Sequence, residues 1–185
     1  MDFTFSQEQQ MLLDTTRRYL QDQASFESRH AEHHQPHNNA HTIWQGMAEL
    51  GLLAVNTPAQ FDGLGCGPVE TMLVMQAVGE SLLLAPYCAS AVVATHLIDT
   101  LGSESQRASW LPALAQGDCI AVLAHDERAT HHDRFAITAT AMKEGDQFHL
   151  HGHKCVVAHA MSADLLLVTV RLQDQLCVFG VPRAM

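Results

Sequence analysis

The spacing of hydrophobic residues changes near Asp118, and this change limits the possible folds more than any other feature of the sequence. Before Asp118, apolar residues recur every three to four positions, which is the spacing of one helix face. After it, short runs of β-branched and aromatic residues alternate with polar ones, as is typical of strands. We therefore predict an all-α domain over residues 1–118 and a strand domain over residues 119–185.

Two helix starts in the first domain carry the pattern of a capping box. Ser6 and Gln9 precede the first of five expected helices, and Ser103 and Gln106 precede the last. Between them lie three helical segments, "TIWQGMAELGLLAV", "VETMLVMQAVGESLL" and "APYCASAVVATHLIDTLG". The first of these is expected to point three side chains inward, namely Trp44, Met47 and Leu50.

The second domain contains five strand-like runs: "CIAVLA", "AITATA", "QFHLHGHKCVVAHA", "ADLLLVTVRL" and "QLCVFGVP". The third of these runs carries a turn at Gly152. Their connections are short, which favours antiparallel pairing of neighbours along the chain. The fold class is therefore predicted to be α+β, with a helical domain followed by a small antiparallel sheet or barrel.

Composition excludes several classes of protein. The formal net charge is −10, whereas a nucleic-acid-binding domain is expected to be basic. The longest nearly apolar run, residues 82–98, contains proline, threonine and histidine and is too short to span a bilayer. The N-terminus lacks the features of a signal peptide, and the five cysteines contain no C-x-x-C. We expect a cytoplasmic protein without nucleic-acid or membrane partners.

Four blocks, in order and spacing, resemble the acyl-CoA dehydrogenase family: "MDFTFSQEQQMLLDTTRRYL", "WQGMAELGLLAVNTPAQFDGLG", "GSESQRASWLPALAQGD" and "GDQFHLHGHKCVVAHAMSADLLLVTV". The resemblance implies an N-terminal helical domain, a middle β-barrel and a C-terminal four-helix bundle. The bundle is expected to be absent from this chain. Within the family, the chain most resembles the small subunit of pimeloyl-CoA dehydrogenase-type enzymes.

The family forms a double bond beside a thioester, with a carboxylate removing the α-proton and FAD accepting the β-hydride. The base normally lies in the C-terminal half, so no catalytic residue is assigned here, and this chain is expected to lack that half. The resemblance further implies an acyl-CoA substrate and assembly with itself or with a homologous dehydrogenase. Electron-transfer flavoprotein is a candidate electron acceptor.

The stretch "LAHDERATHHD" aligns with the family's flavin-side pattern x-x-x-T-E-P-x-x-G-S-D, and no gap is needed between Glu127 and Gly152. Further on, "KCVVAH" takes the place of K-x-W-I-T. The implied FAD-contacting positions are Leu123, His125, Asp126, His132, Val156 and Ala158. Aspartate stands where threonine is usual, and alanine replaces a hydrogen-bonding threonine. Either FAD binds through backbone groups and the other half of the protein, or this chain is a non-catalytic scaffold for an active homologue.

The thirteen histidines suggest metal binding, but their spacing favours solvated segments. His30, His33, His34, His37 and His41 crowd one polar loop, and His149, His151 and His153 alternate along an expected exposed strand face. The histidines and acids of "AHDERATHHD" allow a hydrolytic metal site, although the alignment already explains them as a flavin-side loop. No metal ligands are assigned.

Overall fold

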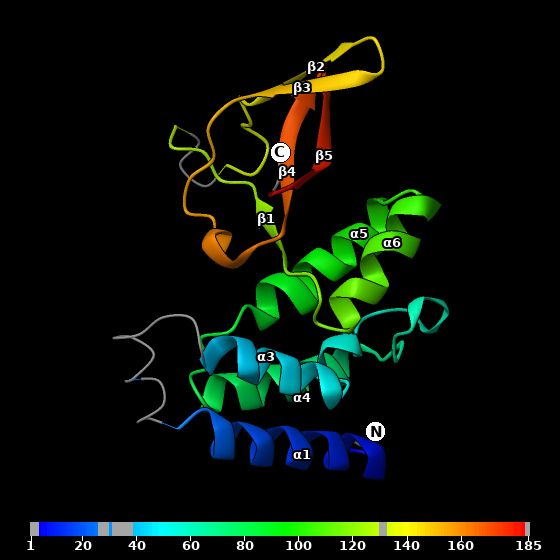
Figure 1. Cartoon of the computed structure of the whole chain (residues 1–185), viewed down its shortest axis with the longest axis vertical. Helices are drawn as coiled ribbons and strands as arrows, with labels where there is room; N and C mark the ends of the chain where they lie inside the picture. Colours follow the sequence, from blue (N-terminus) through cyan, green and yellow to red (C-terminus); the bar gives the residue numbers. More distant parts are fainter. Residues whose placement is uncertain (1–3, 26–29, 31–38, 130–132, 184–185) are drawn as a thin grey trace. The chain divides into compact units, whose positions relative to one another are not determined.

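The computed structural model describes residues 4–25, 30, 39–129 and 133–183. The chain divides into two compact units, Met1–Asp118 and Cys119–Met185, the first made of helices and the second built around a sheet (Figure 1). The α+β character predicted from the change in periodicity is confirmed. Among the described helices, none combines the length and hydropathy that a membrane-spanning helix requires.

The helical unit contains elements of three types. The α-helices are α1 (Gln7–Gln23), α3 (Asn39–Glu49), α4 (Pro68–Glu80), α5 (Thr95–Leu101) and α6 (Glu104–Ala115). A π-helix, Cys88–Ala94, leads directly into α5, and two short 3-10 helices, Leu52–Ala54 and Ala59–Phe61, lie between α3 and α4. The segment expected to form one helix from residue 85 to residue 102 therefore begins as a π-helix.

Both predicted capping boxes are present. The backbone N–H of Gln9 donates to Ser6 Oγ at 3.2 Å, and the N–H of Ser6 donates to Gln9 Oε1 at 2.9 Å. Ser103 and Gln106 make the same two bonds at 3.3 and 2.9 Å. Each box satisfies N–H groups that the first helical turn leaves without partners.

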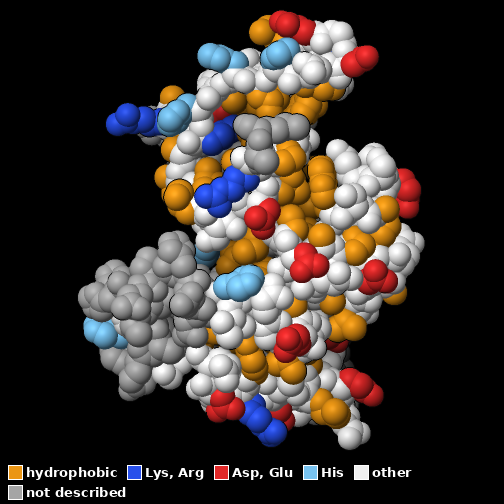
Figure 2. Space-filling model, in the orientation of Figure 1, with side chains coloured by type: hydrophobic (Ala, Val, Ile, Leu, Met, Phe, Trp, Pro, Cys, Tyr) orange, Lys and Arg blue, Asp and Glu red, His pale blue; other side chains and the backbone are white. Residues whose placement is uncertain are grey.

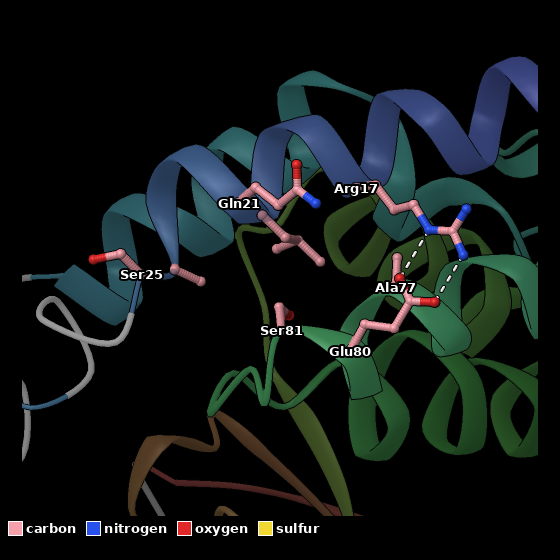
Figure 3. Close-up of a pocket in the computed structure, with 8 residues that line it drawn as sticks. Arg17, Gln21, Ser25, Ala77, Glu80 and Ser81 are labelled. Carbon is pink, nitrogen blue, oxygen red and sulfur yellow. Dashed lines mark hydrogen bonds and ion pairs between the residues drawn. The ribbon is translucent and has the colours of Figure 1, made fainter.

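Helices α1 and α4 pack side by side through their buried faces. Leu13 and Leu20 of α1 and Leu73 of α4 are among the buried side chains. At the surface, the Arg17 guanidinium donates to both oxygens of Glu80, at 2.7 and 2.8 Å, beside a pocket of about 220 Å³ (Figure 3). Because both side chains are partly solvated, this ion pair contributes little to stability.

One inward-facing prediction in the second helical segment is wrong. Trp44 and Met47 are 2% and 0% exposed, as expected, but Leu50 is 43% exposed. Helix α3 ends at Glu49, and Gly51 has a left-handed φ of 72°, so helical spacing no longer applies at Leu50. The chain turns there, and Leu52 takes the buried position instead.

The sheet unit contains β1 (Ala121–Ala124), β2 (Thr140–Glu144), β3 (Gln147–His151), β4 (Leu165–Leu172) and β5 (Gln175–Pro182). β4 is the central strand: it pairs with β5 along its whole length and with β1 and β2 over successive parts. The hairpins β2–β3 and β4–β5 are antiparallel. Closure into a barrel and the absence of a C-terminal bundle remain predictions.

The expectation of an antiparallel sheet is wrong for two of the four pairings, because β1 and β2 both run parallel to β4. The whole β2–β3 hairpin and its flanking loops separate β1 from β4, which gives the chain room to cross back and enter in the same direction. Two strand predictions also differ from the structure. β2 starts at Thr140 rather than at residue 136. β3 ends at His151, directly before the turn expected at Gly152, but the run after this turn, residues 153–160, forms no strand.

Large hydrophobic side chains reach the surface in both units, and Figure 2 shows several such patches on the visible face. In the sheet unit, Phe135 and Met161 are among the most exposed of them. The rings of Phe148 and Phe179, by contrast, meet edge to face with centroids 5.1 Å apart. The hairpin β2–β3 thus packs one side against β5.

Candidate flavin-side site

The two segments predicted to face the flavin lie next to each other in the sheet unit. One, residues 125–127, follows β1, and the other, residues 152–158, follows β3. The backbone N–H of Cys155 donates to the carbonyl oxygen of Asp126 at 2.9 Å. Segments far apart in the sequence are therefore joined where the alignment places the flavin.

A buried ion pair joins the same two segments. Lys154 Nζ is 2.7 Å from Glu127 Oε1, and the two side chains are 10% and 4% exposed. Removing two charges from water is costly unless each finds enough hydrogen-bond partners. The surroundings of each group show whether that condition is met.

The Glu127 carboxylate accepts several further hydrogen bonds. Its Oε2 accepts from the backbone N–H of Thr138 at 2.8 Å and from the Thr138 hydroxyl, and its Oε1 accepts from the N–H of Ala139 at 3.0 Å. Burial alone would raise the pKa of Glu127, but the hydrogen bonds from Lys154, Thr138 and Ala139 outweigh burial and lower that pKa to about 2. Glu127 is therefore a charged, fully hydrogen-bonded group at neutral pH.

The Lys154 ammonium also donates to the carbonyl oxygen of His125 at 3.0 Å and to Thr169 Oγ1 at 3.3 Å. Thr169, on β4, lies 3.1 Å from His125 Nδ1, and its hydroxyl is 3.4 Å from the carbonyl oxygen of Ala124. The network therefore links the end of β1, the middle of β4 and the segment after β3.

Gly152 allows the second segment to approach this network closely. A Cβ atom at position 152 would lie 2.4 Å from the Cβ and 2.8 Å from the Cα of Ala139. Ala139 is the residue whose N–H donates to Glu127. A side chain at position 152 would therefore push apart the segments that the ion pair draws together.

The structure places five of the six predicted FAD-contacting residues, and His132 lies outside the described residues. Leu123 and His125 are half-buried, whereas Asp126, Val156 and Ala158 are exposed. Val156 is 88% exposed, and its φ of 51° is unfavourable for a β-branched side chain. Such strain persists only where the surroundings hold the backbone in place, which the neighbouring bonds of Lys154 and Cys155 do here.

The backbone at this junction is suited to a flavin ring, although the side chains contribute little. Within the described part of the chain, the N–H groups of Asp126, Val156 and Ala158 donate to no other group. N–H groups are the kind of donor that the carbonyl and imine acceptors of an isoalloxazine ring would need, and Val156 offers an exposed apolar surface. The carboxylate of Asp126 and the methyl group of Ala158 provide no neutral side-chain donor.

Sequence patterns did not predict the residues that hold the site together, namely Glu127, Lys154, Thr138 and Thr169. A signal for the first two was present. Glu127 matches the glutamate of the family pattern T-E-P, and Lys154 matches the lysine of K-x-W-I-T. The neighbouring positions of this chain differ from both patterns. Thr138, just before β2, and Thr169, on β4, had no such signal, because their roles depend on contacts that only the fold defines.

The histidine-rich segments take different positions. His149 and His151 lie exposed on β3, His153 lies beyond the strand, and His149 Nε2 is 3.5 Å from Glu144 Oε2. Most of the loop histidines fall at positions 31–38, outside the described residues. Within the residues that the structure describes, no three histidine, cysteine or acidic side chains gather as a metal ion would require.

Comparison with known proteins gives consistent matches. A model of the acyl-CoA dehydrogenase N-terminal domain matches residues 6–118. The mitochondrial isovaleryl-CoA dehydrogenase of Bos taurus is 28% identical over 165 residues, covering 88% of this chain and 39% of that protein. This chain therefore spans about two fifths of the length of that relative.

Two solved structures share the fold. An acyl-CoA dehydrogenase from Bacillus anthracis, complexed with FAD, gives a TM-score of 0.88 at 23% identity, over 97% of this chain and 31% of that one. The ChsE4–ChsE5 complex of Mycobacterium tuberculosis gives 0.87 at 24% identity, over 98% of this chain and 49% of the matched chain. With a domain match over more than half of its length, the chain belongs to the acyl-CoA dehydrogenase family.

Proposed function

We propose that this chain supplies the flavin-side half of an FAD-dependent acyl-CoA dehydrogenase, which introduces an α,β double bond into an acyl-CoA thioester. The observation that carries the proposal is the junction of residues 125–127 with residues 154–158, which presents backbone donors beside the exposed Val156. The FAD complex of the Bacillus anthracis relative supports the choice of cofactor.

FAD, when bound, accepts the hydride that leaves the β-carbon of the substrate. The role proposed for this chain is to bind and orient. The N–H groups of Asp126, Val156 and Ala158 would donate to ring acceptors, and the Val156 side chain would exclude water from one face. No carboxylate of this chain is proposed as the base, and the acyl chain length is not assigned.

A second function, a non-catalytic scaffold subunit, is favoured by one specific feature. Asp126 and Ala158 stand where the family has hydrogen-bonding threonines, and a carboxylate beside a reduced, electron-rich flavin is electrostatically unfavourable. The lost hydroxyl at Ala158 costs about 1 kcal/mol in binding. The ChsE4–ChsE5 structure shows that a chain of this fold occurs in a two-protein complex.

Flavin content distinguishes the two functions. The 185-residue chain alone is expected to purify colourless, because it offers few flavin contacts. Affinity purification of the chain from its native cell, with its bound proteins, is expected to yield a flavoprotein whose absorbance is bleached anaerobically by an acyl-CoA. Replacing Val156 by Asp should lower the flavin content of this complex if the chain contacts FAD. Unchanged flavin content in that variant would contradict the enzymatic proposal and favour the scaffold.

A further inference from the structure

We propose that Glu127 and Lys154 are a positioning pair that holds the two flavin-side segments, residues 125–127 and 154–158, in a single mutual arrangement. The proposal rests on the proposed function, since it assigns these residues to the flavin site. Neither residue is proposed to touch the flavin. Their effect is exerted through the backbone on either side of Asp126 and Val156.

The ammonium group of Lys154 has no spare donor. It carries three N–H bonds and has three acceptors: Glu127 Oε1 at 2.7 Å, the His125 carbonyl at 3.0 Å and Thr169 Oγ1 at 3.3 Å. A group with every donor used has one favourable orientation. Lys154 therefore fixes the distance between its own segment and the carbonyl that precedes Asp126.

The Glu127 carboxylate is equally saturated. Its two oxygens accept from Lys154 and from two backbone N–H groups and one hydroxyl of residues 138 and 139. A carboxylate offers about four acceptor sites, and these bonds occupy them. Glu127 is thereby held against the segment that precedes β2, and Asp126 beside it is held with it.

A buried ion pair adds little net stability over an apolar pair of the same size, so stability alone does not explain this one. The pair instead fixes how the two segments are arranged relative to each other, because each hydrogen bond has a required angle and length. The hydrogen bonds fix atoms of residues 125, 127 and 154, whereas Asp126 and Val156 remain exposed. The fixed atoms therefore lie close in the chain to Asp126 and Val156, whose N–H groups are proposed to contact the flavin.

The test uses the full chain and the substitution Lys154→Met, with Lys143→Met as its control. Lys143 is the only other lysine, and it lies exposed on β2, with Nζ 5.7 Å from the ring centroid of Phe148. Amide hydrogen exchange is measured at Cys155, whose N–H donates to Asp126. We expect this amide to exchange on the order of 100-fold faster in Lys154→Met and to be unchanged in Lys143→Met.

A double variant, Glu127→Gln with Lys154→Met, separates positioning from folding stability. With no buried charge left unpaired, the sheet unit should recover much of its thermal stability. The exchange of the Cys155 amide should stay fast, and the dissociation constant for added FAD should rise about tenfold over the unsubstituted chain, as for other supporting contacts around a site. Recovery of slow exchange together with stability would overturn the positioning role, as would unchanged exchange in Lys154→Met.

A separate result would refute the proposed function without refuting the positioning pair. If the unsubstituted chain, titrated with FAD and followed by flavin fluorescence, shows no binding even with its native partner present, the flavin assignment is wrong. Fast exchange in both Lys154 variants would then still support a pair that positions these two segments. Slow exchange in either variant would refute it.

Discussion

Replacing Glu127 by Gln should destabilise the sheet unit and reduce the stability that it loses below about pH 4.5. The substitution keeps the shape of the side chain but leaves the Lys154 ammonium, 10% exposed, with neutral acceptors only. Removing one member of a buried ion pair costs roughly 3–5 kcal/mol. The shift in the pKa of Glu127 gives a similar free energy. Lowering it from 4.5 to about 2 corresponds to roughly 3 kcal/mol of folding free energy, at about 1.4 kcal/mol per pKa unit.

The sign of the pH effect follows from the direction of the shift. Because the folded state lowers the pKa of Glu127, the stabilisation is fully present above about pH 4.5 and is lost as the pH falls towards about 2. The unsubstituted sheet unit should therefore lose roughly 3 kcal/mol across this window through Glu127. The Glu127→Gln variant should lose none through that position, because an amide does not titrate.

The two units must be followed separately. Both tryptophans and both tyrosines lie in residues 1–118, so intrinsic fluorescence reports the helical unit and serves as an internal control. The amide signals of Thr138 and Ala139, which donate to Glu127, report the sheet unit in urea titrations by NMR. Asp146→Asn, in the exposed β2–β3 turn, removes a solvated carboxylate and should leave the acid response unchanged. An equal loss of stability in acid in Glu127→Gln and in the unsubstituted chain would show that Glu127 does not cause the acid response.

Other substitutions and conditions test further features of the structure. Val156→Gly should stabilise the sheet unit by about 1 kcal/mol in chemical denaturation, because glycine relieves the strain of a φ of 51°. Gly63→Ala should destabilise the helical unit by about 3 kcal/mol, measured by tryptophan fluorescence, because its Cβ would lie 1.9 Å from the carbonyl oxygen of Thr57. Iodoacetamide at about pH 8 should label the exposed Cys88 well before Cys119, whose pKa burial and Asp164 raise to about 11; peptide mass spectrometry gives the order. The exposed hydrophobic patches should make the chain self-associate at micromolar concentration, and a concentration-independent monomer mass in light scattering would contradict this.

Some features of the fold could be predicted from local sequence because local chemistry determines them. A capping box needs only four consecutive residues, so Ser6 and Ser103 identified two helix starts without knowledge of the fold. The change from helical to alternating spacing likewise depends only on neighbouring residues. Leu50 shows where this reasoning fails, since a left-handed glycine one residue later ended the helical periodicity.

Sequence patterns were enough to predict the family, the order of helices before strands, and the two segments that are proposed to face the flavin. The parallel pairing of β1 and β2 with β4 could be seen only in the folded chain, because strand direction depends on how the chain crosses between strands. Only in the folded chain, too, do Glu127 and Lys154, separated by a hairpin, meet as a buried pair that shares its hydrogen bonds with Thr138 and Thr169. Hydrogen bonds between distant residues depend on distances and angles, and only the packed strands define these.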